Sequence, residues 1–157
     1  MDIREAIGPA YSGLEEAKAD VTGMFGLAWL VNHGALPKER LPEYYASYVA
    51  GIFRTLRFGT GEAHGRAEMM EFNYLAEQGA LSLVNGRYAI DYARMPAVLG
   101  QLCKELLQME DTGDRRRAEA WFTKYDKIPD TLRHALAATA GIPVDLDPVF
   151  SFPEKVQ

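Results

Sequence analysis

The sequence predicts a mainly α-helical fold, a bundle of about six helices with one small β-hairpin near residues 81–90. Apolar side chains recur every three to four residues in six successive segments, which is the spacing of an amphipathic helix. One strand signal occurs, where Asn85-Gly86 separates two short apolar runs and favours a type I′ turn. With 157 residues, 48% of them hydrophobic and 25% charged, the chain has the size and composition of one folded domain.

The sequence predicts a flexible lead-in over residues 1–11, followed by a single helical domain over residues 12–157. The lead-in contains Gly8 and Pro9 and shows little periodicity. The first helix is expected to begin at Ser12, because Ser12 and Glu15 fit a capping box, and to end before Gly34.

Two further helices are predicted before the hairpin, over about residues 42–56 and 62–78, and Pro42 suits the first turn of the earlier one. After the hairpin, helices are expected over about residues 98–113, 114–125 and 130–140, the last capped by Asp130 and stopped by Gly141. The prolines and apolar side chains of residues 143–157 predict an extended tail laid against the helical body.

Charge and composition argue against several functional classes. A net charge of −5, from 17 Lys and Arg against 22 Asp and Glu, does not supply the basic surface that nucleic-acid binding needs. The arginine run at residues 115–117 is interpreted as a solvated helix face, and Cys103 as a buried thiol. The sequence shows neither a signal segment nor an apolar run of about 18 residues, so we expect no membrane span and a cytoplasmic location.

Two carboxylates of the first helix are candidate functional groups. Glu16 and Asp20 are four residues apart and therefore share one helix face, where a carboxylate pair can hold a metal or polarise water. The alternative, which spacing alone favours, is an acid-rich first turn that complements the helix dipole, with Glu15 used in the cap.

Among the histidines, His64 has the placement most suited to chemistry. It is expected in the first turn of the third helix, where a neutral imidazole can ligate a metal or donate to a developing oxyanion, although an exposed histidine without function fits equally well. His33 is interpreted as a helix-end cap and His134 as a surface residue, because neither has metal-ligand spacing.

The sequence contains no phosphate-binding glycine loop, Gly-x-Ser-x-Gly elbow, Cys-x-x-Cys pair or His-Glu-x-x-His helix. Residue spacing by itself therefore predicts a helical domain with one acidic helix, and no particular reaction.

Residues 14–20, which read Leu-Glu-Glu-Ala-Lys-Ala-Asp, resemble the second conserved motif of the dipeptidyl peptidase III family, Glu-Glu-x-Arg/Lys-Ala-Asp/Glu. Residues 57–59, 62–65, 72–75 and 143–148 resemble the branch of that family found in proteins with a Nudix domain; they read Arg-Phe-Gly, Glu-Ala-His-Gly, Phe-Asn-Tyr-Leu and Pro-Val-Asp-Leu-Asp-Pro. The similar segments follow in order over nearly the whole chain.

The resemblance implies a zinc metallopeptidase with a peptide substrate. By position, Glu16 would be a zinc ligand, and Glu15 and Asp20 would orient groups around the metal. His64 would face the substrate and steady the tetrahedral intermediate. Zinc, the cofactor of the parent family, would lower the pKa of its bound water and polarise the scissile carbonyl.

The sequence departs from the family at a decisive point, because it lacks the His-Glu-x-x-Gly-His helix that supplies two zinc ligands and the general base. A catalytic zinc normally has three protein ligands. We therefore expect the chain to be a C-terminal piece of such an enzyme, inactive as a peptidase unless an upstream segment is supplied. The missing ligands leave open whether this chain binds zinc at all.

Two other functions compete with this interpretation. A non-enzymatic interaction or ligand-binding module that has kept the fold and lost the metal site would expose an apolar surface, and is expected to form a homodimer. A different hydrolytic activity would use His64 with Glu16 or Glu62 as an acid–base pair, provided that these side chains converge on a shared pocket.

Overall fold

The computed structural model of the protein describes residues 2–143, 148, 149 and 151. Within these residues the predicted class is confirmed: the fold is mainly helical, with one antiparallel hairpin. The elements in chain order are α1 (Ile3–Ile7), η1 (Gly8–Ala10), α2 (Tyr11–Asn32), η2 (Lys38–Arg40), α3 (Leu41–Leu56), α4 (Ala63–Glu77), β1 (Leu81–Val84), β2 (Arg87–Ile90), α5 (Met95–Thr112), α6 (Arg115–Tyr125) and α7 (Asp130–Ala138).

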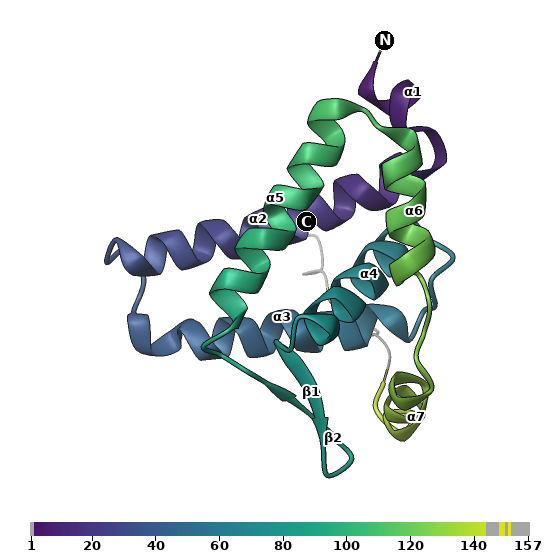
Figure 1. Cartoon of the computed structure of the whole chain (residues 1–157). Helices are drawn as coiled ribbons and strands as arrows, with labels where there is room; N and C mark the ends of the chain where they lie inside the picture. The colour runs from purple at the N-terminus through teal and green to yellow at the C-terminus, as the bar shows by residue number, and fades with distance from the viewer. Residues whose placement is uncertain (1, 144–147, 150, 152–157) are drawn as a thin grey trace, which may run out of the picture.

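The helix α4 occupies the centre of the molecule and touches α2, α3, α5, α6 and β1. Figure 1 shows α2 and α3 as two long helices joined at one end through η2, with α5 lying across α2. The hairpin and α7 project on the side of α3 that is remote from α5. This arrangement brings the first half of α2 against α4, so that residues about 50 positions apart in the sequence can meet.

The core forms where the apolar faces of these helices converge. Burial of a large aliphatic or aromatic side chain contributes about 1.5–3 kcal/mol. The largest fully buried side chains are those of Tyr45, Phe72, Ile7, Leu14, Ile52, Met69, Met70, Leu75, Leu81, Met95, Leu99 and Leu102.

The hairpin has the turn that the Asn-Gly pair predicts. Asn85 and Gly86 both have positive φ, 50° and 76°, as a type I′ turn requires. Two strands alone are marginal in water. Here Tyr88 packs edge-on against Phe72 of α4 and Phe53 of α3, with ring centroids 5.3 and 5.5 Å apart, so the hairpin is anchored on the helices.

The N-terminal residues differ from the predicted lead-in. Residues 3–10 form α1 and η1, and Ile7 is fully buried in the core. The physical reason is tertiary: Ile3 and Ala6 lie against Gly113 at the end of α5, a contact between distant parts of the chain that local periodicity does not reveal.

Two predicted helix caps are wrong. The helix α2 begins at Tyr11 and follows η1 without a break, so Ser12 lies inside the helix and cannot act as an N-cap, which needs extended backbone. Near the C-terminus, Pro129 is the N-cap of α7, Asp130 is its first residue, and the helix ends at Ala138, before Gly141. The backbone of Pro129 is extended, so the N-cap lies one residue closer to the N-terminus than predicted.

Several other predictions can be compared directly. Cys103 is buried. In the arginine run, Arg115 and Arg116 are exposed and Arg115 pairs with Glu119 at 2.7 Å, whereas Arg117 is partly buried and pairs with Glu105 of α5 at 2.6 Å. The predicted tail lies largely outside the described residues, but Val149 is 94% exposed and so is not laid against the body. Among the described helices, none has both the length and the hydrophobicity that a membrane crossing requires.

Candidate functional site

The structure brings Glu16 of α2 and His64 of α4 together. Nε2 of His64 lies 3.0 Å from Oε2 of Glu16, and the two side chains remain 64% and 35% exposed respectively. The contact therefore lies at the surface of the α2–α4 packing, where both groups are accessible to a ligand. An imidazole and a carboxylate in hydrogen-bond contact can share or transfer a proton.

A close backbone approach fixes where His64 points. Glu62 is the extended N-cap of α4, so His64 falls in the first helical turn. The next residue, Gly65, is buried against the preceding loop, and a Cβ atom there would lie 2.1 Å from the carbonyl oxygen of Gly59. Only glycine allows this approach, which holds the start of α4 tightly against the loop.

Asp20 lies one helical turn after Glu16 and faces the same α2–α4–α3 junction. Burial raises the pKa of the Asp20 carboxyl, while His64 lowers it and Glu16 raises it. Asp20 also lines a groove of about 370 Å³ between α2 and α3. The predicted pair of carboxylates on one face is therefore present, with Asp20 in the less polar surroundings.

Glu15 points to a different neighbour. Its carboxylate accepts a hydrogen bond from Lys18, whose Nζ also donates to Glu110 of α5 at 2.7 Å. The hydrogen bond from Lys18 lowers the pKa of Glu15. Glu15 therefore ties α2 to α5 through Lys18 and does not cap the helix.

Two carboxyl groups at the same junction were missed by sequence reasoning. Glu71 is fully buried, and Oε2 of Glu71 accepts a hydrogen bond of 2.6 Å from the hydroxyl of Tyr48. Glu68 lies one turn before Glu71, and burial raises its pKa to about 7. The signal for Glu68 was its position four residues after His64, on the same helix face. Glu71 carries no such signal, because a glutamate between apolar residues normally reads as exposed.

The described residues do not by themselves compose a metal site. A catalytic zinc takes three protein ligands and keeps a fourth position open. No group of three or more His, Cys, Asp or Glu side chains in the described part of the chain has an arrangement that could hold a metal ion. The zinc-ligand role expected of Glu16 therefore stays a prediction.

The other histidines lie away from this pair. His33 is the C-cap of α2, where Nδ1 lies 2.8 Å from the carbonyl oxygen of Trp29, as the sequence predicts. His134 is exposed on α7. For the acid–base hypothesis, His64 meets Glu16, yet both lie outside the groove that Asp20 lines. That groove therefore does not provide the shared pocket which the hypothesis requires.

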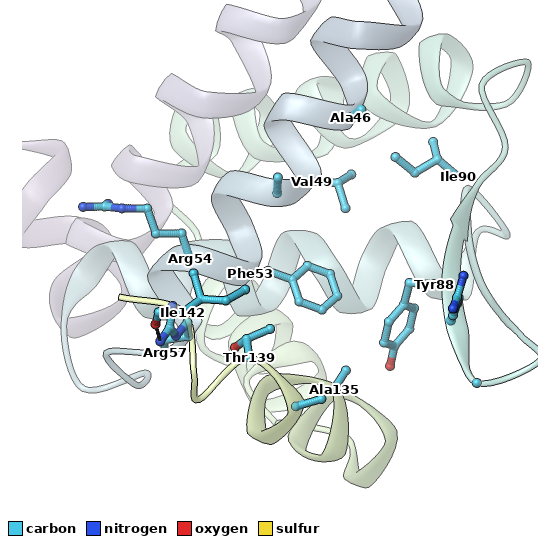
Figure 2. A pocket seen from close by; sticks show the side chains of 14 residues that line it. Ala46, Val49, Phe53, Arg54, Arg57, Tyr88, Ile90, Ala135, Thr139 and Ile142 are labelled. Atoms are coloured by element: carbon cyan, nitrogen blue, oxygen red, sulfur yellow. Dashed lines mark hydrogen bonds between the residues drawn. The ribbon is translucent and has the colours of Figure 1, made fainter. Parts of the chain in front are cut away.

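A second concave surface lies between α3, the hairpin and α7. Figure 2 shows this groove of about 580 Å³, with Phe53 and Tyr88 directed into it and Ala135 on its far wall. Arg57 lines one end and donates hydrogen bonds to the backbone carbonyl groups of Ile142 and Pro143. Sequence reasoning missed the groove, because its walls come from three segments that only the fold brings together.

The fold is shared with segments of known proteins. A scan against models of protein families finds no match. The structure superposes on DPP III from Caldithrix abyssi with a TM-score of 0.92 and 31% sequence identity, covering 96% of this chain and 29% of that one. Dipeptidyl-peptidase III from Corallococcus sp. strain EGB gives a TM-score of 0.89 and 31% identity, with 95% and 28% covered.

The fold of this chain is therefore like that of a helical segment of dipeptidyl peptidase III. In sequence, the chain is similar to Nudix hydrolase 3 of Arabidopsis thaliana, with 35% identity over 157 residues. That alignment covers 98% of this chain but 20% of the plant protein. The chain thus spans about a fifth to under a third of the proteins that it resembles.

Proposed function

We propose that the chain is the C-terminal helical part of a dipeptidyl peptidase III-like zinc metallopeptidase, and that it has no peptidase activity by itself. The observation that carries the proposal is the 3.0 Å contact between Glu16 and His64, in a segment whose fold matches two such peptidases at 31% identity. Upstream polypeptide with a His-Glu-x-x-Gly-His helix would be the partner that completes the site.

In this proposal each predicted residue has a separate task. Glu16 offers a carboxylate oxygen to zinc, whose chemistry when bound is to activate water and polarise a peptide carbonyl. His64 stands beside it on α4, where its ring can donate a hydrogen bond toward a peptide substrate. Asp20, one turn further along α2, orients these neighbours from the less exposed side of the junction, and Glu15 holds α2 to α5 through Lys18.

A chimera tests the proposal directly. The segment of the Caldithrix abyssi enzyme that matches this chain is replaced by residues 1–157, since the two superpose with a TM-score of 0.92. We expect the chimera to bind zinc and to release dipeptides. Glu16→Gln should lower its zinc content by at least about tenfold, in line with the loss of a metal ligand or its support. His64→Ala should keep the zinc and lower the rate.

The exposed Glu39 of η2 gives a matched control, because Glu39→Gln removes the same charge far from α4 and should change neither quantity. The isolated chain should bind zinc only weakly in calorimetry. A Glu16→Gln chimera with full zinc content and full activity would contradict the assignment. Tight stoichiometric zinc binding by the isolated wild-type chain, lost in Glu16→Ala, would contradict the need for an upstream segment.

A second candidate function is that of an interaction module, and the exposed apolar face at the far end of α2 favours it. Phe25, Trp29 and Leu30 are 53%, 52% and 41% exposed, an unusual cluster for a surface that faces only water. In this alternative the face binds a second copy of the chain. In the first proposal, the same face packs against upstream polypeptide.

Oligomeric state separates the two roles of this face. If the module hypothesis holds, light scattering at rising concentration should show a dimer for the wild type and a monomer for Trp29→Glu. Phe58→Glu is the matched control, because Phe58 is 61% exposed at the end of α3, remote from this face, and its replacement should leave the dimer intact. A wild-type chain that stays monomeric at high concentration would rule out the homodimer.

A further inference from the structure

The junction of α2, α3 and α4 contains a carboxyl group that no solvent reaches. Glu71 of α4 is fully buried. Among the residues that the structure describes, no other Asp, Glu, Lys or Arg is buried. The Tyr48 hydroxyl donates to its Oε2 at 2.6 Å, while its Oε1 has no hydrogen-bond partner. A buried carboxylate with one donor is poorly stabilised, so the neutral acid is favoured. Burial accordingly raises the pKa of Glu71 well above its ordinary range.

A second carboxyl group adjoins the first. Glu68 lies one turn before Glu71, and its Oε2 is also buried without a hydrogen-bond partner. Burial is the main reason why its pKa rises to about 7; a hydrogen bond from Thr55 opposes the rise. Glu68 therefore loses its proton near neutral pH, in contrast to an exposed glutamate.

The groups that face these two acids come from all three helices. The α2 helix contributes Asp20, whose negative charge raises the pKa of both Glu68 and Glu71. The α3 helix contributes Tyr48 and the cation of Arg54, and α4 itself contributes His64; Arg54 and His64 both lower the pKa of Glu68. When Glu68 and Glu71 ionise, up to three negative charges therefore meet in a partly dry junction, where like charges repel strongly.

The two acids are linked to the candidate site because Glu68, Glu71 and His64 all lie on α4. His64 lies one turn before Glu68 on α4, and its ring touches Glu16 across the α2–α4 contact at 3.0 Å. Any change in how closely α4 packs on α2 therefore changes this distance. The Tyr48–Glu71 hydrogen bond similarly joins α4 to α3.

We propose that Glu68 and Glu71 are positioning residues: when protonated, they keep α2, α3 and α4 packed together and thereby hold His64 against Glu16. This protonation-dependent contact between the three helices is called the clasp. With both acids neutral the clasp is closed, and α4 packs against its two neighbours. Ionisation places like charges inside the junction, and α4 loosens. The clasp requires no zinc; its consequence for peptide hydrolysis rests on the proposed function.

The direction of the pH effect follows from proton linkage. Glu68 has a higher pKa in the folded chain, about 7, than its ordinary value of 4.5 in an unfolded chain. The folded state therefore binds the proton more tightly, and the stability contributed by this proton is fully present below pH 4.5 and is lost as the pH rises through about 7. Glu71, whose pKa is also raised by burial, acts in the same direction.

Amide hydrogen exchange, followed by mass spectrometry at pH 5 and pH 8 and corrected for intrinsic exchange rates, tests the clasp on the isolated 157-residue chain. In the wild type, the protection of α4 amides should fall by on the order of tenfold or more at the higher pH, as the pKa difference of Glu68 requires. Glu68→Gln cannot ionise, so it should remove most of this fall. Glu71→Gln should act in the same direction and gives a second, independent variant.

Glu62→Gln is the matched control, because Glu62 is an exposed acid at the N-cap of the same helix and makes no side-chain capping bond. It should retain the wild-type pH dependence. Protection of α4 that does not change with pH in the wild type would overturn the clasp, as would an unchanged pH dependence in both glutamine variants. The experiment contains neither zinc nor substrate, so its failure would leave the assignments of Glu16 and His64 to be decided by the chimera.

Discussion

Gly65→Ala is expected to destabilise the chain by about 3 kcal/mol or more, the upper part of the range for over-packed sites. The new Cβ atom would lie 2.1 Å from the carbonyl oxygen of Gly59 and 3.1 Å from the Cα atom of Thr60. Both neighbours are backbone atoms, so no side chain can rotate away, and either the loop or the first turn of α4 must move. Urea unfolding followed by circular dichroism measures the loss.

The chain offers a glycine with the opposite expectation. Gly23 lies inside α2, and a Cβ atom there would have no neighbour within 4 Å. Gly23→Ala should therefore stabilise the chain by up to about 1 kcal/mol, the helix-propensity difference between the two residues. If both variants unfolded at the wild-type urea concentration, the close approach of the loop to α4 would be contradicted. Because His64 adjoins Gly65, the chimera with Gly65→Ala should also lose activity.

The sequence predicts the elements of this fold well because local chemistry decides them. Asn85-Gly86 determines the hairpin turn, and the register pairs Val84 with Arg87 around it as a two-residue loop demands. The six helices expected between residues 12 and 140 correspond to α2–α7, since each has an apolar stripe at helical spacing. What local chemistry does not decide is the packing of residues 1–11, which depends on a contact between α1 and the end of α5.

Part of the candidate site could likewise be predicted from the sequence, and part could not. Glu16 and Asp20 are linked by helical spacing, and the acid–base hypothesis paired His64 with Glu16 or Glu62; the structure places His64 3.0 Å from Glu16. The zinc and substrate roles of these residues stay predictions. Glu71 could not be found from the sequence, because nothing local distinguishes a glutamate that faces Tyr48 in the core from one that faces water.

The chain matches only part of the length of its two structural relatives. The matched segment makes up 29% and 28% of the two structural relatives, so most of each of those chains lies outside it. In this chain the polar side chains of Glu16 and His64 are partly exposed, and apolar residues of α2 are exposed as well. Both features are consistent with surfaces that further polypeptide covers, which is why the chimera is more informative than the chain alone.

Phe72→Ala is the second change with a large expected effect, a loss of about 3–5 kcal/mol, as found for buried phenylalanines. Phe72 is 1% exposed, and its ring contacts Phe53 of α3 at 5.9 Å and Tyr88 of the hairpin at 5.3 Å between centroids. The substitution should leave a cavity where three elements meet, because edge-to-face rings cannot close on an alanine.

Phe58→Ala is the matched control, because it makes the same substitution at an exposed position. Phe58 is 61% exposed, and its main ring contact is the guanidinium of Arg54 at 5.8 Å, so its loss should alter the stability by no more than about 0.5 kcal/mol. Hydrogen exchange gives a sharper readout than global unfolding. In Phe72→Ala the amides of β1 and β2 should lose protection before those of α5, because the hairpin depends on this ring cluster, whereas α5 packs mainly on α2. Equal loss in all elements would mean that the hairpin unfolds only with the whole domain.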